Sequence, residues 1–213
     1  MQLTAIVMAS GLSRRMQSNK LLIPVNGKPM IQHTLDLLIW DGGFPEILRP
    51  KMKMTCPQLT RLDVVVVTAY EEIKKMGEER GFRVVWNDQP EVGQSRSAVL
   101  GVANGGDCDG YLFFTGDMPY LTRGTVEKVI GKFLEFPDSI IVPRYGEKNG
   151  NPVAFPKGLK DELLALTGDT GGRKVIKEHP KKVLYVEIAD DTQGFDMDCP
   201  EDLEQMKRFE VEK

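Results

Sequence analysis

Residues 3–9 read LTAIVMA, and residues 10–20, which follow directly, read SGLSRRMQSNK. The first stretch is an uninterrupted run of apolar and β-branched residues, which is typical of a strand covered on both faces of a parallel sheet. Ligands of such sheets bind beyond the carboxyl ends of the strands. The loop at 10–20 is therefore expected to lie at a binding edge.

The residues of this loop suit a polyphosphate. Gly11 is expected to turn the chain sharply and present backbone N–H groups to an anion, and Arg14, Arg15 and Lys20 add positive charge. The spacing matches neither a Walker A loop nor the three-glycine dinucleotide fingerprint. A solvated basic turn between a strand and a helix is the alternative that the local pattern leaves open.

Strands and helices alternate along the rest of the chain, which predicts a mostly parallel α/β sheet in one domain, 1–213. Strands are expected at 63–68, 82–86, 111–115, 139–143, 153–155 and 183–188. Helices are expected at 30–40, 71–80, 98–104, 122–136, 158–166 and 172–179. The stretch between the first helix and the second strand is long for such a connection, so residues 42–60 are interpreted as an insertion.

Acidic residues follow strands in two places. Asp117 ends a strand within Gly116-Asp117-Met118-Pro119, where one carboxylate could hold Mg²⁺ against phosphates. The alternative is that Asp117 caps the helix at 122–136, although Thr122 can provide that cap. Asp196 and Asp198 share one face of an extended segment, so they are further candidate Mg²⁺ ligands.

Composition excludes several classes of protein. A formal net charge of −3 gives no support for a nucleic-acid partner. The three cysteines, Cys56, Cys108 and Cys199, have no paired spacing that would indicate a disulfide framework or a zinc site. Every apolar run is short of the ~20 residues that span a bilayer, and no secretory leader is recognisable, so we expect a cytoplasmic protein without a membrane partner.

Three motifs resemble those of the nucleotidyltransferases that load CTP or GTP onto the molybdenum cofactor. Residues 9–16 with 19–22 resemble the signature loop, nearest to the cytidylyltransferase branch, with Ser10 and Gln17 as departures from it. Gly116–Pro119 and 196–203 are similar to the family's two acidic motifs, with Cys199 replacing a threonine. The resemblance implies a three-layer α/β/α sandwich whose Rossmann-like sheet is of the nucleotide-diphospho-sugar transferase type.

The resemblance also implies roles for individual residues. Lys20, Arg15 and Asp117 would be catalytic, and Asp117, Asp196 and Asp198 would hold the metal. The nucleotide would contact Ala9, Ser10, Gly11, Ser13, Arg14, Lys20, Asn87, Ser95, Ser97 and Gly116, and the acceptor would contact Asn151, Pro152, Asp169 and Arg173. From the residues alone, Ser95 and Ser97 could equally cap a helix, and the loop at 168–173 could be a flexible connector.

Three functions remain in competition. The first is transfer of a nucleotide monophosphate from CTP to a molybdopterin-type acceptor with release of pyrophosphate. The second is a transferase of the same fold that uses GTP or a sugar-phosphate or other phosphate acceptor. The third is a non-catalytic accessory protein that binds the cofactor and delivers it to a molybdenum hydroxylase apo-enzyme.

Overall fold

The computed structural model describes residues 1–13, 19–40, 58–199 and 201–202. The predicted insertion at 42–60 therefore falls almost entirely outside the described residues, as do Arg14 and Arg15. No helix in the described part of the chain is both long enough and apolar enough to cross a bilayer.

The core of the protein is an eight-stranded sheet with β1 at its centre. The strand order is β10-β7-β9-β6-β1-β4-β5, with β8 paired to β7 outside this path. The strands are β1 (Gln2–Ala9), β4 (Arg61–Thr68), β5 (Arg83–Trp86), β6 (Gly110–Thr115), β7 (Ile140–Tyr145), β8 (Lys148–Asn149), β9 (Val153–Pro156) and β10 (Val183–Ile188). Pairing is parallel except along β9 and β8, so β1, β4, β5 and β6 end at the same edge.

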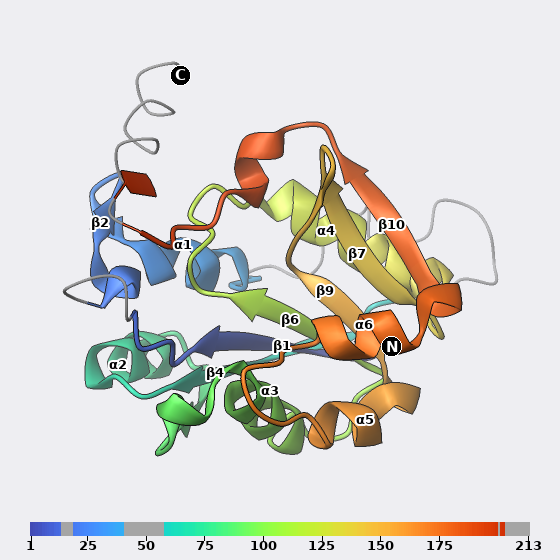
Figure 1. Cartoon of the computed structure of the whole chain (residues 1–213), viewed down its shortest axis with the longest axis horizontal. Coiled ribbons are helices and arrows are strands. Elements are labelled where there is room, and N and C mark those ends of the chain that lie inside the picture. Colours follow the sequence, from blue (N-terminus) through green and yellow to red (C-terminus); the bar gives the residue numbers. More distant parts are fainter. Residues whose placement is uncertain (14–18, 41–57, 200, 203–213) are drawn as a thin grey trace.

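Helices cover both faces of the sheet, as Figure 1 shows for α1 and α4 on one side and α3 and α5 on the other. The helices are α1 (Met30–Leu37), α2 (Glu71–Glu79), α3 (Gln94–Ala103), α4 (Arg123–Glu135), α5 (Lys160–Leu164) and α6 (Arg173–Glu178). Leu3, Ala5 and Val7 of β1 pack into the core under α1, α2 and α4. Ile6 faces the other core with α3, α5 and α6. The predicted α/β/α sandwich is confirmed, and the double-sided burial of β1 explains its unbroken apolar run.

Several predicted details were wrong. The helix at 30–40 ends at Leu37, and those at 158–166 and 172–179 shorten to α5 and α6. β7 and β9 pair as antiparallel neighbours inside the main sheet, where a mostly parallel arrangement was expected. Hydrophobic periodicity shows which residues are buried, but it marks the ends of an element poorly.

A small hairpin that the sequence analysis missed follows the signature loop. β2 (Pro24–Val25) and β3 (Lys28–Pro29) pair around Asn26 and Gly27, whose φ angles are 48° and 79°. Two consecutive left-handed residues define a tight hairpin turn, for which Asn-Gly is the strongest sequence signal. Val25 of this hairpin belongs to a third apolar cluster with Met30, Tyr120 and Met197, which attaches the C-terminal acidic segment to α1.

Candidate active site

The carboxyl edge of the sheet is held together by hydrogen bonds between neighbouring strand ends. Thr68 Oγ1 donates to Ala9 O at 3.0 Å, and Asn87 N donates to Thr68 O at 2.8 Å. Ser10 Oγ donates to Val67 O at 3.1 Å and is buried. Ala9 and Ser10 after β1, Thr68 on β4 and Asn87 after β5 thus form one continuous row along this edge of the sheet.

The loop after β1 differs in one respect from the prediction. Gly11 was expected to make the sharp turn, but the positive φ of 47° falls on Ser13. A Cβ placed on Gly11 would meet no atom within 4 Å, so packing does not require glycine there. The Gly11 carbonyl instead accepts a hydrogen bond from the Tyr70 hydroxyl at 2.8 Å, and Ser13 Oγ accepts one from Lys20 N at 3.1 Å.

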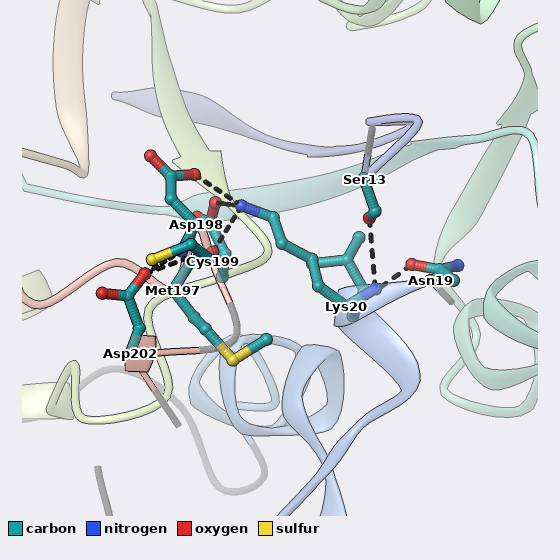
Figure 2. Close-up of polar contacts among 9 residues, drawn as sticks. Ser13, Asn19, Lys20, Met197, Asp198, Cys199 and Asp202 are labelled. Carbon is teal, nitrogen blue, oxygen red and sulfur yellow. Dashed lines mark hydrogen bonds and ion pairs between the residues drawn. The ribbon is translucent and has the colours of Figure 1, made fainter. Parts of the chain in front are cut away.

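Lys20 opens a short 3₁₀ helix, η1 (Lys20–Leu22), that the Asn19 side chain caps by accepting from Leu21 N. The Lys20 ammonium meets three acceptors: Asp117 Oδ2 at 2.7 Å, Asp198 Oδ1 at 2.9 Å and Met197 O at 2.5 Å. Figure 2 shows Lys20 directed at the segment that contains Met197 and Asp198. Side chains from the beginning, middle and end of the chain therefore converge on one cation.

Asp117 follows β6 directly, and the glycine before it is needed for packing. A Cβ on Gly116 would lie 2.6 Å from Ile31 Cδ1 and 3.2 Å from Leu21 Cδ2, so only glycine lets α1 and η1 approach this closely. Gly116 therefore packs closely against α1 and η1. Its contact with the nucleotide stays a prediction. The alternative that Asp117 is a helix cap is excluded, because Thr122 is the N-cap of α4 and its Oγ1 accepts from Thr125 N at 3.4 Å.

The C-terminal acidic segment has the alternation that the sequence predicted. Met197 is fully buried between two exposed aspartates, Asp196 and Asp198, and its N–H donates to Asp117 O at 3.2 Å. Asp202 Oδ2 accepts from both Asp198 N and Cys199 N at 2.7 Å and so fixes the end of the segment. The backbone bond between Met197 and Asp117 holds the two acidic stretches side by side.

Charge is concentrated at this convergence. Burial alone would lower the pKa of Lys20, but the Asp117 and Asp198 carboxylates outweigh it and raise that pKa above its ordinary value. Partial desolvation raises the pKa of Asp196, and the nearby negative charges of Asp117 and Asp198 raise it further. Asp196 is thus close enough to the other two carboxylates to feel their charge, although its own side chain is exposed.

The donor atoms present fit a hard divalent cation only in part. Asp117 Oδ1 is buried and has no hydrogen-bond partner among the described residues, which leaves one carboxylate oxygen open to a cation. Within the same residues, however, no three His, Cys, Asp or Glu side chains are grouped so that they could bind a metal by themselves. Mg²⁺ is commonly held by one or two carboxylates together with substrate phosphates, and this donor set suits that arrangement.

The serine candidates lie on α3 and do not cap it. α3 begins at Gln94, so Ser95 and Ser97 fall inside its first turn, where both are buried. Ser97 Oγ accepts from Asn87 Nδ2 at 3.3 Å. The predicted helix start at Ala98 was wrong, and the alternative that these serines cap the helix is excluded, because α3 starts one turn earlier.

Among the described residues, the hydrogen bonds of the predicted acceptor residues do not involve Lys20. Asp169 Oδ1 accepts from Gln94 N at 3.2 Å, so the loop at 168–173 is held against the N-terminus of α3. Asn151 precedes Pro152 in a cis peptide, and its carbonyl accepts from Tyr145 Oη at 2.7 Å. Arg173 is exposed at the start of α6. In the described part of the chain, the hydrogen bonds of Asp169 and Asn151 run to Gln94 and Tyr145.

The surface hollow of about 330 Å³ lined by Met1, Asp107 and Lys157 lies at the opposite, amino-terminal edge of the sheet. The candidate site is therefore identified by converging side chains and not by cavity volume. Sequence reasoning missed Tyr70 and the Met197 carbonyl altogether. Tyr70 directly follows a strand end, which is a usable signal, whereas a backbone carbonyl leaves no trace in a sequence.

A mostly parallel sheet with a lysine-bearing loop after its central strand and aspartates at a neighbouring strand end defines a nucleotidyltransferase type of fold and site. The chain belongs to the MobA-like NTP transferase domain family, whose model matches residues 5–183. A Pyrococcus horikoshii protein named "Probable molybdenum cofactor guanylyltransferase" is 31% identical over 193 residues, covering 88% of each chain.

Solved structures share the fold. A homologue of Mycobacterium tuberculosis Rv0371c from Mycobacterium sp. strain JC1 has a TM-score of 0.76 at 24% identity and covers 99% of this chain and 97% of its own. Rv0371c itself, solved in complex with manganese, has a TM-score of 0.69 at 22% identity and covers 97% of this chain and 98% of its own. At these identities the two structures are evidence for the fold alone.

Proposed function

We propose that the protein transfers a nucleoside monophosphate from a nucleoside triphosphate to a molybdopterin-type acceptor. An oxygen of the acceptor would attack the α-phosphorus, the bond between the α-phosphorus and the bridging oxygen would break, and pyrophosphate would leave. The observation that carries the proposal is the convergence of the Lys20 ammonium with Asp117 and Asp198, at 2.7 and 2.9 Å. Membership of the MobA-like family supports the reaction class.

Lys20 would supply the positive charge that the leaving pyrophosphate needs. Its pKa is raised by the neighbouring carboxylates, so it remains an ammonium at neutral pH. A positioned cation in a partly dehydrated site stabilises charge as it develops on phosphate oxygens. Arg14 and Arg15, outside the described residues, are proposed to assist it from the same loop.

Asp117 would be the main ligand of a divalent cation, with Asp196 and Asp198 as the other candidates. The open Oδ1 of Asp117 supports this assignment. When bound, Mg²⁺ would neutralise phosphate oxygens. The carboxylates themselves hold Lys20 in place until the triphosphate arrives.

The nucleotide would lie along the row of strand ends. Ala9, Ser10, Gly11 and Ser13 are proposed to present backbone groups to the phosphates, and Asn87, Ser95 and Ser97 to lie near the nucleoside. The acceptor would bind toward Asn151, Pro152, Asp169 and Arg173. Asn87 adjoins the end of β4 through Thr68 O. Asp169 lies against Gln94 beside Ser95, so the two proposed subsites would adjoin at the start of α3.

CTP is our first choice of donor, because the signature loop resembles the cytidylyltransferase branch more closely. GTP is the second candidate, because the P. horikoshii relative is named a guanylyltransferase. The test is a panel of CTP, GTP, ATP and UTP with molybdopterin, with and without Mg²⁺, in which pyrophosphate is measured. Release of pyrophosphate with CTP alone supports CTP as the donor. Release of pyrophosphate with GTP alone identifies GTP as the donor instead.

The same experiment separates the enzyme from an accessory protein. Pyrophosphate release that depends on both acceptor and Mg²⁺ is the expected result. Binding of molybdopterin without pyrophosphate from any of the four nucleotides would overturn the transferase. It would favour delivery of a finished cofactor to a molybdenum hydroxylase apo-enzyme.

A further inference from the structure

We infer that Gln193 is a positioning residue, which holds the carboxylates of the C-terminal segment in place by fixing that segment to the start of α4. The inference rests on the proposed function, since it concerns the groups that surround Lys20. Gln193 lies in the short 3₁₀ helix η6 (Asp191–Gly194), just before Asp196. Gln193 belongs to none of the motifs identified in the sequence.

The Gln193 side chain is buried, with 9% of its surface exposed, and its carbonyl is fully used. Oε1 accepts three hydrogen bonds: from Thr122 N at 3.3 Å, Thr122 Oγ1 at 2.8 Å and Thr125 Oγ1 at 2.7 Å. All three donors belong to the N-terminus of α4. A buried acceptor with three donors is expensive to remove, because each donor is left without a partner.

These bonds connect the two acidic stretches at a second point. Thr122 belongs to the loop that begins with Asp117, and Gln193 belongs to the stretch that leads to Asp196 and Asp198. Between these stretches the bond from Met197 N to Asp117 O is the first tie, at 3.2 Å, and Gln193 provides the second. Burial of Met197 and the hydrogen bonds to Asp202 hold the middle and the end of the segment. Gln193 holds its beginning, so loss of the Gln193 bonds is expected to let that end shift.

Lys20 reports on this geometry. Two of its three acceptors, Met197 O and Asp198 Oδ1, belong to the segment that Gln193 fixes. If the segment pivots, the ammonium loses these partners, and the Lys20 side chain, which is 13% exposed, becomes more accessible to reagents in solution. The hydrogen bonds hold the Lys20 amine against the segment and shield it, so the rate at which an acylating reagent reaches it measures whether the segment is in place.

The experiment measures the rate of Lys20 acylation by mass spectrometry in the full chain, without metal, nucleotide or acceptor. Gln193→Met, which keeps the size but not the carbonyl, is expected to accelerate Lys20 acylation roughly fivefold or more. Thr4→Val is the matched control, because it removes a buried bond to Gly105 O at 2.8 Å elsewhere in the protein.

A purely structural role for Gln193 predicts a different result. Gln193→Met and Thr4→Val would then lower the melting temperature alike, while Lys20 reacted at the wild-type rate in both, and the inference would be overturned. If Gln193→Met does not fold, Thr125→Val removes one donor with little change of shape. A faster Lys20 reaction in folded Thr125→Val supports the inference, and an unchanged rate overturns it.

Failure of the proposed function would be visible separately, because labelling uses none of the substrates. Wild-type protein that released no pyrophosphate could still show the dependence of Lys20 on Gln193. If turnover is observed, Gln193→Met is expected to lower kcat more than it raises KM for the nucleotide. The row of Ala9, Ser10 and Asn87 lies on the other strands and is not held by Gln193.

Discussion

The Met197 N–H donates to the Asp117 carbonyl at 3.2 Å, and this bond joins the two acidic stretches of the site through their backbones. The Asp117 and Asp198 side chains then reach the same ammonium from opposite stretches. A backbone contact of this kind depends little on side-chain identity. The site can therefore be tested by changing side chains without removing the connection that assembles it.

Lys20→Met is expected to lower turnover by about 10²–10³, the size associated with the loss of one group that stabilises developing charge. The methionine keeps most of the length of the lysine and removes its charge. The measurement is kcat for pyrophosphate release at saturating nucleotide. Lys28→Met is the control, because Lys28 pairs with Asp36 on α1. A change of less than twofold in Lys20→Met would remove Lys20 from the reaction.

Asp117→Asn is expected to weaken binding of Mn²⁺ at least tenfold, since loss of even an indirect partner of a metal site costs about 10–100-fold in affinity. The asparagine amide keeps the shape of the aspartate side chain but has no negative charge to attract the cation. Titration with Mn²⁺ in the presence of nucleotide, followed by electron paramagnetic resonance, measures the affinity. Asp63→Asn on β4 is the control, because Asp63 pairs with Arg61 elsewhere. Equal affinity in both variants would mean that Asp117 is not a ligand.

Gly116→Ala is expected to destabilise the fold by about 1–3 kcal/mol, the usual cost of overpacking, and also to displace η1 and lower turnover. The added methyl would meet Ile31 and Leu21, and Leu21 follows Lys20 directly. Gly77→Ala is the matched control, because its Cβ would lie 2.9 Å from Val84 Cγ2, between α2 and β5. We expect Gly116→Ala and Gly77→Ala to lose similar amounts of stability and only Gly116→Ala to lose turnover. Equal turnover would show that Gly116 does not position Lys20.

Asp36→Asn tests an ion pair outside the site. Desolvation alone would raise the pKa of Asp36, but hydrogen bonds from Lys28 and Arg80 outweigh it and hold the pKa below its ordinary value of 3.8. A carboxylate whose pKa is lower in the folded than in the unfolded protein stabilises the fold at pH values above its unfolded pKa. This stabilisation is lost as the pH falls through the folded pKa. Because the Asp36 side chain is 37% exposed, solvent screening limits the effect to about 1 kcal/mol or less.

The measurement is the melting temperature of both proteins from pH 7 to pH 2.5. The wild type is expected to melt higher at pH 7 by about 2–4 °C per kcal/mol. The difference should shrink only below pH 3.8. A difference that stayed constant down to the lowest pH would mean that charge at Asp36 does not contribute.

The sheet could be predicted from the sequence because its strands are buried on both faces. Ile6 and Val7 point into opposite cores, so the strand is apolar throughout and easy to recognise. The alternation of Asp196, Met197 and Asp198 could be predicted for a related reason, since an extended chain repeats every two residues. In both cases a short-range pattern determines which way side chains point.

Loop details could not be predicted in this way. Among the described residues of the signature loop, Ser13 and not Gly11 has the left-handed backbone. The Tyr70 hydroxyl, from the region after β4, binds the Gly11 carbonyl. α3 starts at Gln94 because Asp169, far along the chain, accepts from its first N–H. Contacts between residues so distant in sequence leave no local pattern, and Gln193 was missed for the same reason.

Because Met197 is fully buried, the number of residues in its segment is constrained. Its side chain is enclosed with Val25, Met30 and Tyr120, while the residues on either side of it reach the solvent. Adding or deleting a single residue between Gln193 and Met197 would shift the alternation of buried and exposed side chains by one position. A carboxylate would then enter the apolar cluster, and the Met197 thioether would face the solvent. The number of residues between Gln193 and Met197 is therefore expected to be fixed.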